Sequence, residues 1–117
     1  MRILALLALF LIGSATVASA AEDVTAGQSV IRAQEEALSR DDAATAYTFA
    51  SPGIQRRFHD PETFLSMVRN GYTPVYRHRS FEFGEAKASD GTILQEVHII
   101  DANGVAWEAL YTLPTEA

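Results

Sequence analysis

The chain has 117 residues, a formal net charge of −6 and no cysteine. A chain of this length builds one small domain rather than two, and without cysteine it forms neither disulfides nor thiolate metal sites. Its acidic charge argues against nucleic acid and anionic membrane surfaces as partners.

The first 20 residues have the pattern of a cleaved signal peptide. Arg2 precedes an unbroken apolar run from Ile3 to Ile12, and small residues then end in Ala18-Ser19-Ala20, a motif that signal peptidase accepts. The alternative is an uncleaved membrane anchor, but the dense apolar part is only half of the roughly 20 residues that a span needs. We therefore expect cleavage after Ala20 and a periplasmic or secreted domain of residues 21–117. Loss of Arg2 changes the net charge from −6 to −7.

The first half of this domain is predicted to be helical. Apolar residues recur at helical spacing from Val24 through Ile31 to Leu38, and the helix is expected to end near Ser39 and Arg40. Three further helical starts follow, with caps and prolines in the usual places. They are Asp41 or Asp42 before residues 43–50, Ser51-Pro52 before a short turn, and Asp60-Pro61 before a helix with Phe64, Leu65 and Val68 inward. That last helix is expected to end at Asn70-Gly71, with the glycine left-handed.

Beyond Tyr72 the apolar period becomes that of strands. Pro74 is expected to begin an extended piece that reaches His78, and residues 80–88 alternate around Phe81 and Phe83. Two dipeptides, Asp90-Gly91 and Asn103-Gly104, are signals for two-residue hairpin loops. Helices followed by a meander of three to four antiparallel strands predict an α+β fold in which the helices cover one face of a curved sheet.

Two-residue loops at both turns would fix which residues share a face of the sheet. Phe83 would then lie opposite His98, and Glu96 opposite Tyr111. The face with the bulky aromatic residues is expected to meet the helices; it comprises Phe81, Phe83, Glu85, Leu94, Glu96, His98, Ile100, Trp107, Tyr111 and Leu113. The other face is small and apolar, and we expect a homodimer through its residues Gly84, Val97, Ile99 and Leu110. A three-residue loop at Asn103-Gly104 would instead turn Trp107 and Tyr111 outward.

The polar residues of the aromatic face form the predicted site. A pocket lined by Phe83, Glu85, His98, Trp107 and Tyr111 would hold a small ligand. As an acid–base enzyme, His98 or Glu96 would abstract a proton while Tyr111 donates to an oxyanion. We favour the simpler interpretation, a histidine that a neighbouring acid satisfies inside the core, because every small domain has titratable strand residues.

The remaining polar motifs predict no cofactor and no metal. His59-Asp60 is explained as a helix cap, and Asp101-x-Asn103-Gly104 lacks the other ligands of a calcium loop. Two basic clusters, Arg56-Arg57 and Arg77-His78-Arg79, would suit an anion dock at the mouth of the fold. Solvated charge that balances an acidic protein explains them better.

Several strings of residues carry a family resemblance. They are Ala50-Ser51-Pro52-Gly53-Ile54-Gln55, Phe58, Phe64, Met67-Val68, Gly71-Tyr72, Pro74-Val75-Tyr76-Arg77, Gln95-Glu96-Val97, Asp101, Gly104, Trp107 and Ala109-Leu110-Tyr111. From about Gln28 to Leu113 the chain resembles domain-of-unknown-function family 4864, small exported bacterial proteins, and this resemblance implies no activity. Its members run on into one more strand, whereas this sequence stops at Ala117, so the last strand is expected to keep an open edge.

The order of elements is also similar to the nuclear-transport-factor-2-like, or cystatin-like, roll. That resemblance implies a curved sheet that wraps a helix and encloses a conical pocket, in a fold that hosts enzymes and binding modules alike. The sequence thus predicts an exported, non-catalytic domain that binds a small ligand. The alternatives are a lyase- or isomerase-like enzyme that uses His98, Glu96 and Tyr111, and an interaction module whose last strand pairs with a partner chain.

Overall fold

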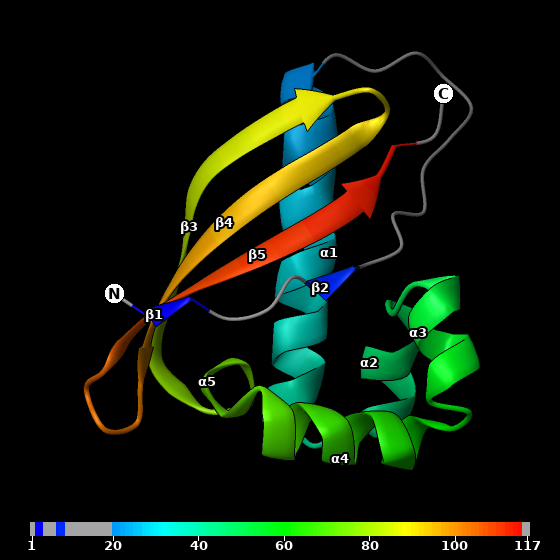
Figure 1. Cartoon of the computed structure of the whole chain (residues 1–117), viewed down its shortest axis with the longest axis vertical. Coiled ribbons are helices and arrows are strands. Elements are labelled where there is room, and N and C mark those ends of the chain that lie inside the picture. Colours follow the sequence, from blue (N-terminus) through cyan, green and yellow to red (C-terminus); the bar gives the residue numbers. More distant parts are fainter. Residues whose placement is uncertain (1, 4–6, 9–19, 116–117) are drawn as a thin grey trace.

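The computed structural model describes residues 2–3, 7–8 and 20–115 (Figure 1). Most of the predicted signal peptide, including Ala18 and Ser19 of its cleavage motif, lies outside these residues. In the part of the chain that is described, no helix is long and apolar enough to cross a membrane.

Five helices come first in the described domain. The longest, α1 (Ala20–Ser39), ends where the sequence predicts, and it buries one stripe that includes Ile31, Ala37 and Leu38. The shorter helices are α2 (Ala43–Thr48), α3 (Pro52–Arg57), α4 (Pro61–Gly71) and α5 (Thr73–Tyr76). The predicted caps are confirmed, because the side chains of Asp42, Ser51 and Asp60 each accept a hydrogen bond from the backbone N–H three residues further on.

Two local predictions at the end of this helical half are wrong. Gly71 is the last residue of α4 and has no positive φ; Tyr72 ends the helix instead, and its N–H bonds to the carbonyl of Val68. The segment around Pro74 is not extended, because proline in the first turn loses no hydrogen bond and its φ already suits a helix. It forms the single turn α5, which lies before the sheet.

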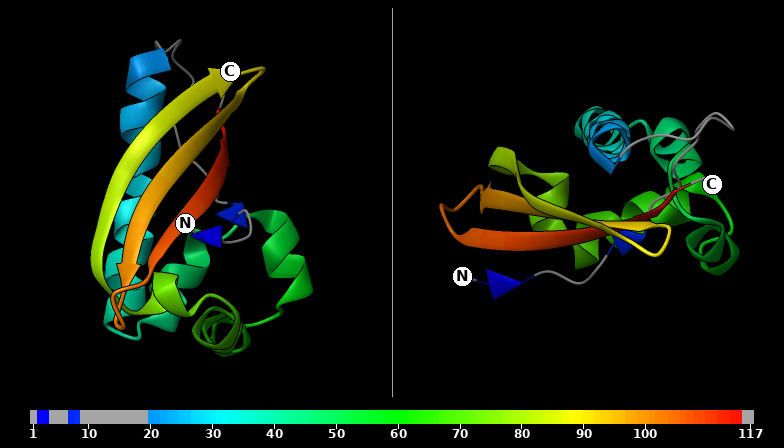
Figure 2. Two further views of the ribbon diagram at one scale, coloured as in Figure 1. Left: turned by 60° about the vertical axis from the view of Figure 1, so that its left-hand side comes forward. Right: turned by 90° about the horizontal axis from the view of Figure 1, so that it is seen from above.

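The second half of the domain is an antiparallel meander of three strands. They are β3 (His78–Ser89), β4 (Thr92–Asp101) and β5 (Ala106–Pro114). Two short strands, β1 (Arg2–Ile3) and β2 (Leu7–Ala8), pair in parallel with the other edge of β5. The sheet curves, and α1 runs along its inner face while α2 to α5 gather at one end (Figure 2). The predicted α+β class, with N-terminal helices on one face of a meander, is confirmed.

The first hairpin has the predicted two-residue loop, but a β-bulge then shifts its register. Ser89 lies opposite Thr92 across Asp90-Gly91, whereas Phe83 lies opposite Val97 rather than His98. The shift falls between Phe83 and Ala86, where two residues, Gly84 and Glu85, face one residue on β4. The shift places Val97 on the inner face beside Phe83, and buried Ile93 and Gln95 continue that face of β4 toward the loop.

The second hairpin has a three-residue loop. The N–H of Asp101 bonds to the carbonyl of Val105, and Gly104 supplies the positive φ of 83° that the loop requires. His98 therefore lies opposite Glu108, and Tyr111 lies opposite Gln95. This loop does not turn Tyr111 outward, because the bulge in the first hairpin has already reversed β4.

The two deviations together keep the aromatic residues of β3 and β5 on the inner face, while β4 and residues 86–89 of β3 have the opposite orientation from the prediction. The core between sheet and helices is continuous, and its buried members are Ile31, Ala37, Leu38, Ala43, Ala46, Ala50, Phe64, Leu65, Val68, Val75, Phe81, Val97, Ile99, Ala109, Tyr111 and Leu113. Burial of this apolar surface is the main force that holds α1 on the sheet.

Candidate functional site

The residues predicted to line a pocket are divided between the two faces of the sheet. Phe83, Trp107 and Tyr111 lie on the inner face, as expected, and the first two are partly buried against the core. His98 is exposed on the outer face, where its cross-strand neighbours are Glu82 on β3 and Glu108 on β5. The predicted inward position of His98 is therefore wrong.

The two acids of the predicted group, Glu85 and Glu96, also lie away from the core. Glu85 is exposed at the bulge, and Glu96 is half-buried on the same side of β4 as His98. The ring of His98 rests on Gly84, where an added Cβ would collide with it. Since His98 and Glu96 do not meet Tyr111, the structure does not assemble the predicted acid–base group.

The surface predicted for a homodimer is not one surface. Val97 and Ile99 are 0% exposed and belong to the core. Gly84 and Leu110 are half-buried at the outer side of the sheet. The predicted dimer face is thus wrong in composition, because the reversal of β4 exchanged its residues, and homodimerisation stays a prediction.

A different polar cluster does occupy the space between α1 and the start of β3. Nε2 of His78 lies 2.7 Å from Oε2 of Glu35, and the two side chains are only 12% and 14% exposed. The other carboxylate oxygen of Glu35 accepts a hydrogen bond of 2.6 Å from Nη1 of Arg32. One half-buried carboxylate therefore joins a cation on its own helix to a ring on the sheet.

Both nitrogens of His78 are engaged. Nδ1 lies 2.9 Å from the carbonyl oxygen of Pro74, in α5, while Nε2 faces Glu35. A carbonyl oxygen and a carboxylate both accept hydrogen bonds, so the ring is satisfied when it donates from each nitrogen. Neither nitrogen is left to take a proton from a substrate, and His78 serves to tie α5 and β3 to α1.

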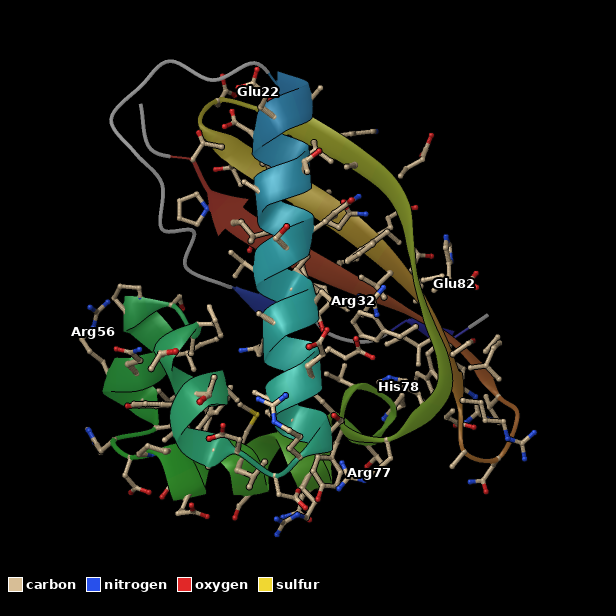
Figure 3. The ribbon with its side chains drawn as sticks, turned by 180° about the vertical axis from the view of Figure 1, so that it is seen from behind. Glu22, Arg32, Arg56, Arg77, His78 and Glu82 are labelled. Carbon is tan, nitrogen blue, oxygen red and sulfur yellow. The ribbon has the colours of Figure 1, made fainter. Side chains whose placement is uncertain are left out.

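Arg32 is fixed by three hydrogen bonds and two aromatic rings. Its Nη1 and Nη2 atoms lie 3.4 and 3.3 Å from the carbonyl oxygen of Phe81, in addition to the bond to Glu35. Its guanidinium carbon lies 5.2 Å from the ring centroid of Phe81 and 4.9 Å from that of Phe83. Both distances lie within the range of cation–π attraction. A long side chain is thus held in one orientation on the inner side of β3 (Figure 3).

The side chain of Arg32 lines a groove between α1 and β3. The groove has a volume of about 410 Å³, and its lining consists of Thr25, Gln28, Ser29, Arg32, Ala33, Glu36 and Phe83. In Figure 3, Arg32 points from α1 toward β3, and His78 lies further along, near the start of β3. Hydroxyl and amide groups on α1 face one aromatic ring on β3, so the groove offers several hydrogen-bonding groups beside a single apolar wall.

The bulge in β3 forms part of the framework of this groove. The amide nitrogen of buried Gln95 donates to the carbonyl oxygens of Gly84 and Glu85, at 3.2 and 3.3 Å. Its amide oxygen accepts a hydrogen bond of 3.1 Å from Gln28, a lining residue. A buried amide that satisfies the irregular backbone thereby also fixes a polar side chain of the groove.

Tyr111 lies deeper, in the core beneath the cluster. Burial raises the pKa of its hydroxyl above the ordinary value of 10.0, and the negative charge of Glu35 raises it further. The phenol therefore remains neutral in the folded protein, and its ring packs edge-on to Phe81 with centroids 6.5 Å apart.

The two basic clusters separate in the structure. Arg77 donates to the carbonyl oxygen of Leu38 at 3.2 Å and pairs with Asp41, so it secures the end of α1, while Arg79 is exposed. Arg56 and Arg57 are exposed on α3. The two clusters do not come together as an anion dock, the alternative that the sequence left less favoured than solvated charge. In the residues that the structure describes, no group of three or more histidines and acids could hold a metal ion.

Sequence patterns gave little sign of the cluster that the structure reveals. Arg32 and Glu35 are an i, i+3 pair on the flank of an apolar stripe, which is ordinary for a surface helix. His78 lies in a basic run. The one available signal was the position of Arg32 and Glu35 at the border of the stripe, where long polar side chains reach over a core.

Comparison with known families identifies the family to which the chain belongs. The family described as "Domain of unknown function (DUF4864)" matches residues 20–117, and the chain belongs to it. This match confirms the resemblance seen in the sequence and carries no activity. No curated protein and no solved structure matches the chain.

Proposed function

We propose that this protein is an exported, non-catalytic domain that binds a small neutral molecule in the groove between α1 and β3. The signal-peptide pattern of residues 1–20 supports export. The observation that supports binding is the fixed position of Arg32, which lines the groove next to the half-buried ring of Phe83.

The hydrogen-bonding capacity of Arg32 indicates what the ligand offers. A guanidinium has five N–H donors, and the hydrogen bonds to Glu35 and Phe81 use three of them in the described part of the chain. Two donors remain for a ligand, which therefore supplies acceptor oxygens. The ring of Phe83 favours an apolar, preferably planar, group beside those oxygens.

The local charge favours a neutral ligand over an anion. Glu35 is paired with Arg32 and offsets its positive charge, and Glu36 adds a negative charge to the lining. A carboxylate would meet repulsion from Glu36 with little net attraction in return. An amide, an ester or a sugar accepts the same hydrogen bonds without this cost.

The state of His78 supports binding rather than catalysis. General acid–base chemistry needs a group that can reach a substrate proton. The two nitrogens of His78 instead bond to Pro74 and Glu35. Tyr111, the one member of the predicted acid–base group that lies inward, is 1% exposed.

The proposal is tested with two matched probes, benzamide and benzoate, which share a ring and differ in charge. Each is titrated into the isotopically labelled chain, and backbone amide shifts are followed by NMR. We expect benzamide to shift Gln28, Arg32 and Phe83 together, with benzoate binding at least several-fold more weakly. Shifts confined to other parts of the domain, or tighter binding of benzoate, would contradict the proposal.

A further inference from the structure

The hydroxyl groups that line the groove present oxygen lone pairs rather than hydrogens. The Thr25 hydroxyl donates to the carbonyl oxygen of Ala21 at 3.1 Å, and the Ser29 hydroxyl donates to the carbonyl oxygen of Thr25 at 3.1 Å. A hydroxyl has one hydrogen and two lone pairs, so each of these groups is left to accept. Glu36 adds a carboxylate, which also accepts, to the same lining. The α1 wall of the groove is therefore rich in acceptors.

The amide of Gln28 has one orientation, which is set from inside the sheet. The amide nitrogen of buried Gln95 lies 2.7, 3.2 and 3.3 Å from backbone carbonyl oxygens, and such oxygens only accept. The amide oxygen of Gln95 must therefore face Gln28, which donates to it from Nε2 at 3.1 Å. Gln28 then retains its own amide oxygen and one N–H. In the described part of the chain no residue donates to that oxygen, so a ligand can.

Arg32 supplies most of the donors. It follows Gln28 by four residues, so the two side chains are neighbours on one face of α1. Its two remaining N–H groups and one N–H of Gln28 face a larger set of acceptors on Thr25, Gln28, Ser29 and Glu36. A ligand that only accepts would displace water from these oxygens without replacing its hydrogen bonds. A cationic donor is disfavoured as well, because the guanidinium of Arg32 repels it.

We propose that the groove selects a ligand whose acceptor oxygen lies beside an N–H donor, as in a primary amide or a lactam, and that Gln28 determines this preference. The inference rests on the proposed function and narrows it. The ligand oxygen accepts from Arg32, and the ligand N–H donates to the amide oxygen of Gln28. Both groups belong to one planar unit, which suits two side chains one helical turn apart and leaves the attached ring for Phe83. An ester or a ketone of the same shape accepts from Arg32 but donates nothing to Gln28.

The ligand's part in this preference is tested with benzamide and acetophenone. The two molecules have nearly the same shape, and a methyl group in acetophenone replaces the NH2 group of benzamide. Each is titrated into the isotopically labelled chain, and the backbone amide shifts of Gln28, Arg32 and Phe83 are followed by NMR. We expect wild type to bind benzamide at least about fivefold more tightly than acetophenone. Equal affinity for both at the groove would overturn the inference and leave the proposed function standing. If neither molecule shifts these three residues, both are wrong.

The part of Gln28 is tested by the ratio of the two dissociation constants, in which a general loss of affinity cancels. Q28M removes the amide oxygen, and we expect the preference for benzamide to fall below about twofold. The matched control is Q28E, which loses the same hydrogen bond to Gln95 but keeps an acceptor, and it should retain the preference. Circular dichroism checks that both variants fold. A preference in Q28M as large as that of wild type, or equal ratios in Q28M and Q28E, would overturn the role of Gln28.

Discussion

Nε2 of His78 and Oε2 of Glu35 lie 2.7 Å apart, although 43 residues separate them in the chain. The pair connects the C-terminal part of α1 to the first residue of β3, and the same carboxylate positions Arg32 at the groove. A carboxylate with two partners in a space this enclosed contributes both to the stability of the fold and to the geometry of the proposed site.

Replacement of this carboxylate by an amide is therefore expected to destabilise the domain. In E35Q, His78 and Arg32 lose a shared negative charge while shape and volume are kept. We expect the free energy of unfolding to fall by about 2 kcal/mol, measured by urea denaturation at neutral pH. The control is E36Q, whose exposed side chain lies next to Glu35 on α1 and should change stability by less than about 0.5 kcal/mol. Equal effects of the two variants would show that the Glu35 pairs contribute nothing.

Burial of Tyr111 predicts a loss of stability in alkali. Its pKa in the folded protein is raised above 10.0, so above this pH the unfolded chain releases a proton that the folded protein keeps. The free energy of unfolding should then fall with rising pH, by at most about 1.4 kcal/mol per pH unit from this one group. In Y111F this part of the slope is absent. Urea titrations of wild type, Y111F and the control Y72F between pH 9 and 11 check the prediction, which fails if Y111F and wild type have the same slope.

Gly27 offers a stabilising substitution. It lies inside α1, and a Cβ added there would be 3.7 Å from both Cδ atoms of Leu113 and 3.8 Å from Cδ1 of Ile93, which is ordinary contact. Alanine is favoured over glycine in a helix interior by about 1 kcal/mol, so G27A should raise the free energy of unfolding by up to that amount. Thermal unfolding measures the change. A fall in melting temperature would contradict the prediction that the space between α1 and the sheet accepts the added methyl group.

The sequence predicted the class of fold because its local signals agree with the tertiary structure. The caps at Asp42, Ser51 and Asp60, and the loop Asp90-Gly91, depend on neighbours within a few residues. Such features can be read without knowledge of the remaining chain. They establish the order of helices and strands, and with it the confirmed α+β arrangement.

The sequence did not reveal which residues of β4 face the helices, because the register of β4 depends on two irregularities elsewhere in the sheet. Gly84-Glu85 forms a bulge inside an alternating run, and its carbonyls are satisfied by the side chain of Gln95 on another strand. Asn103-Gly104 belongs to a three-residue loop, which the Asp101 carboxylate stabilises by accepting from the N–H groups of Asn103 and Val105. Each feature shifts the register by one residue, and one residue is enough to reverse a strand.

The candidate site was missed for the same reason. His98 is central only in the predicted register, and the basic run around His78 predicts a solvated side chain. The pairing of His78 with Glu35 arises because a single residue separates α5 from β3 and α1 contacts both, a relation between distant segments. Local spacing carries no information about such a contact.

The most direct test of the proposed function is the affinity of benzamide for R32M, compared with wild type and R56M. Methionine keeps an apolar stem but removes the N–H donors that Arg32 presents to the groove, whereas Arg56 is exposed on α3 and does not line it. Loss of two hydrogen bonds should weaken binding at least tenfold, or about 1.4 kcal/mol, in R32M and leave R56M unchanged. Equal affinity of R32M and wild type, with the fold of R32M intact by circular dichroism, would contradict a ligand site built around Arg32.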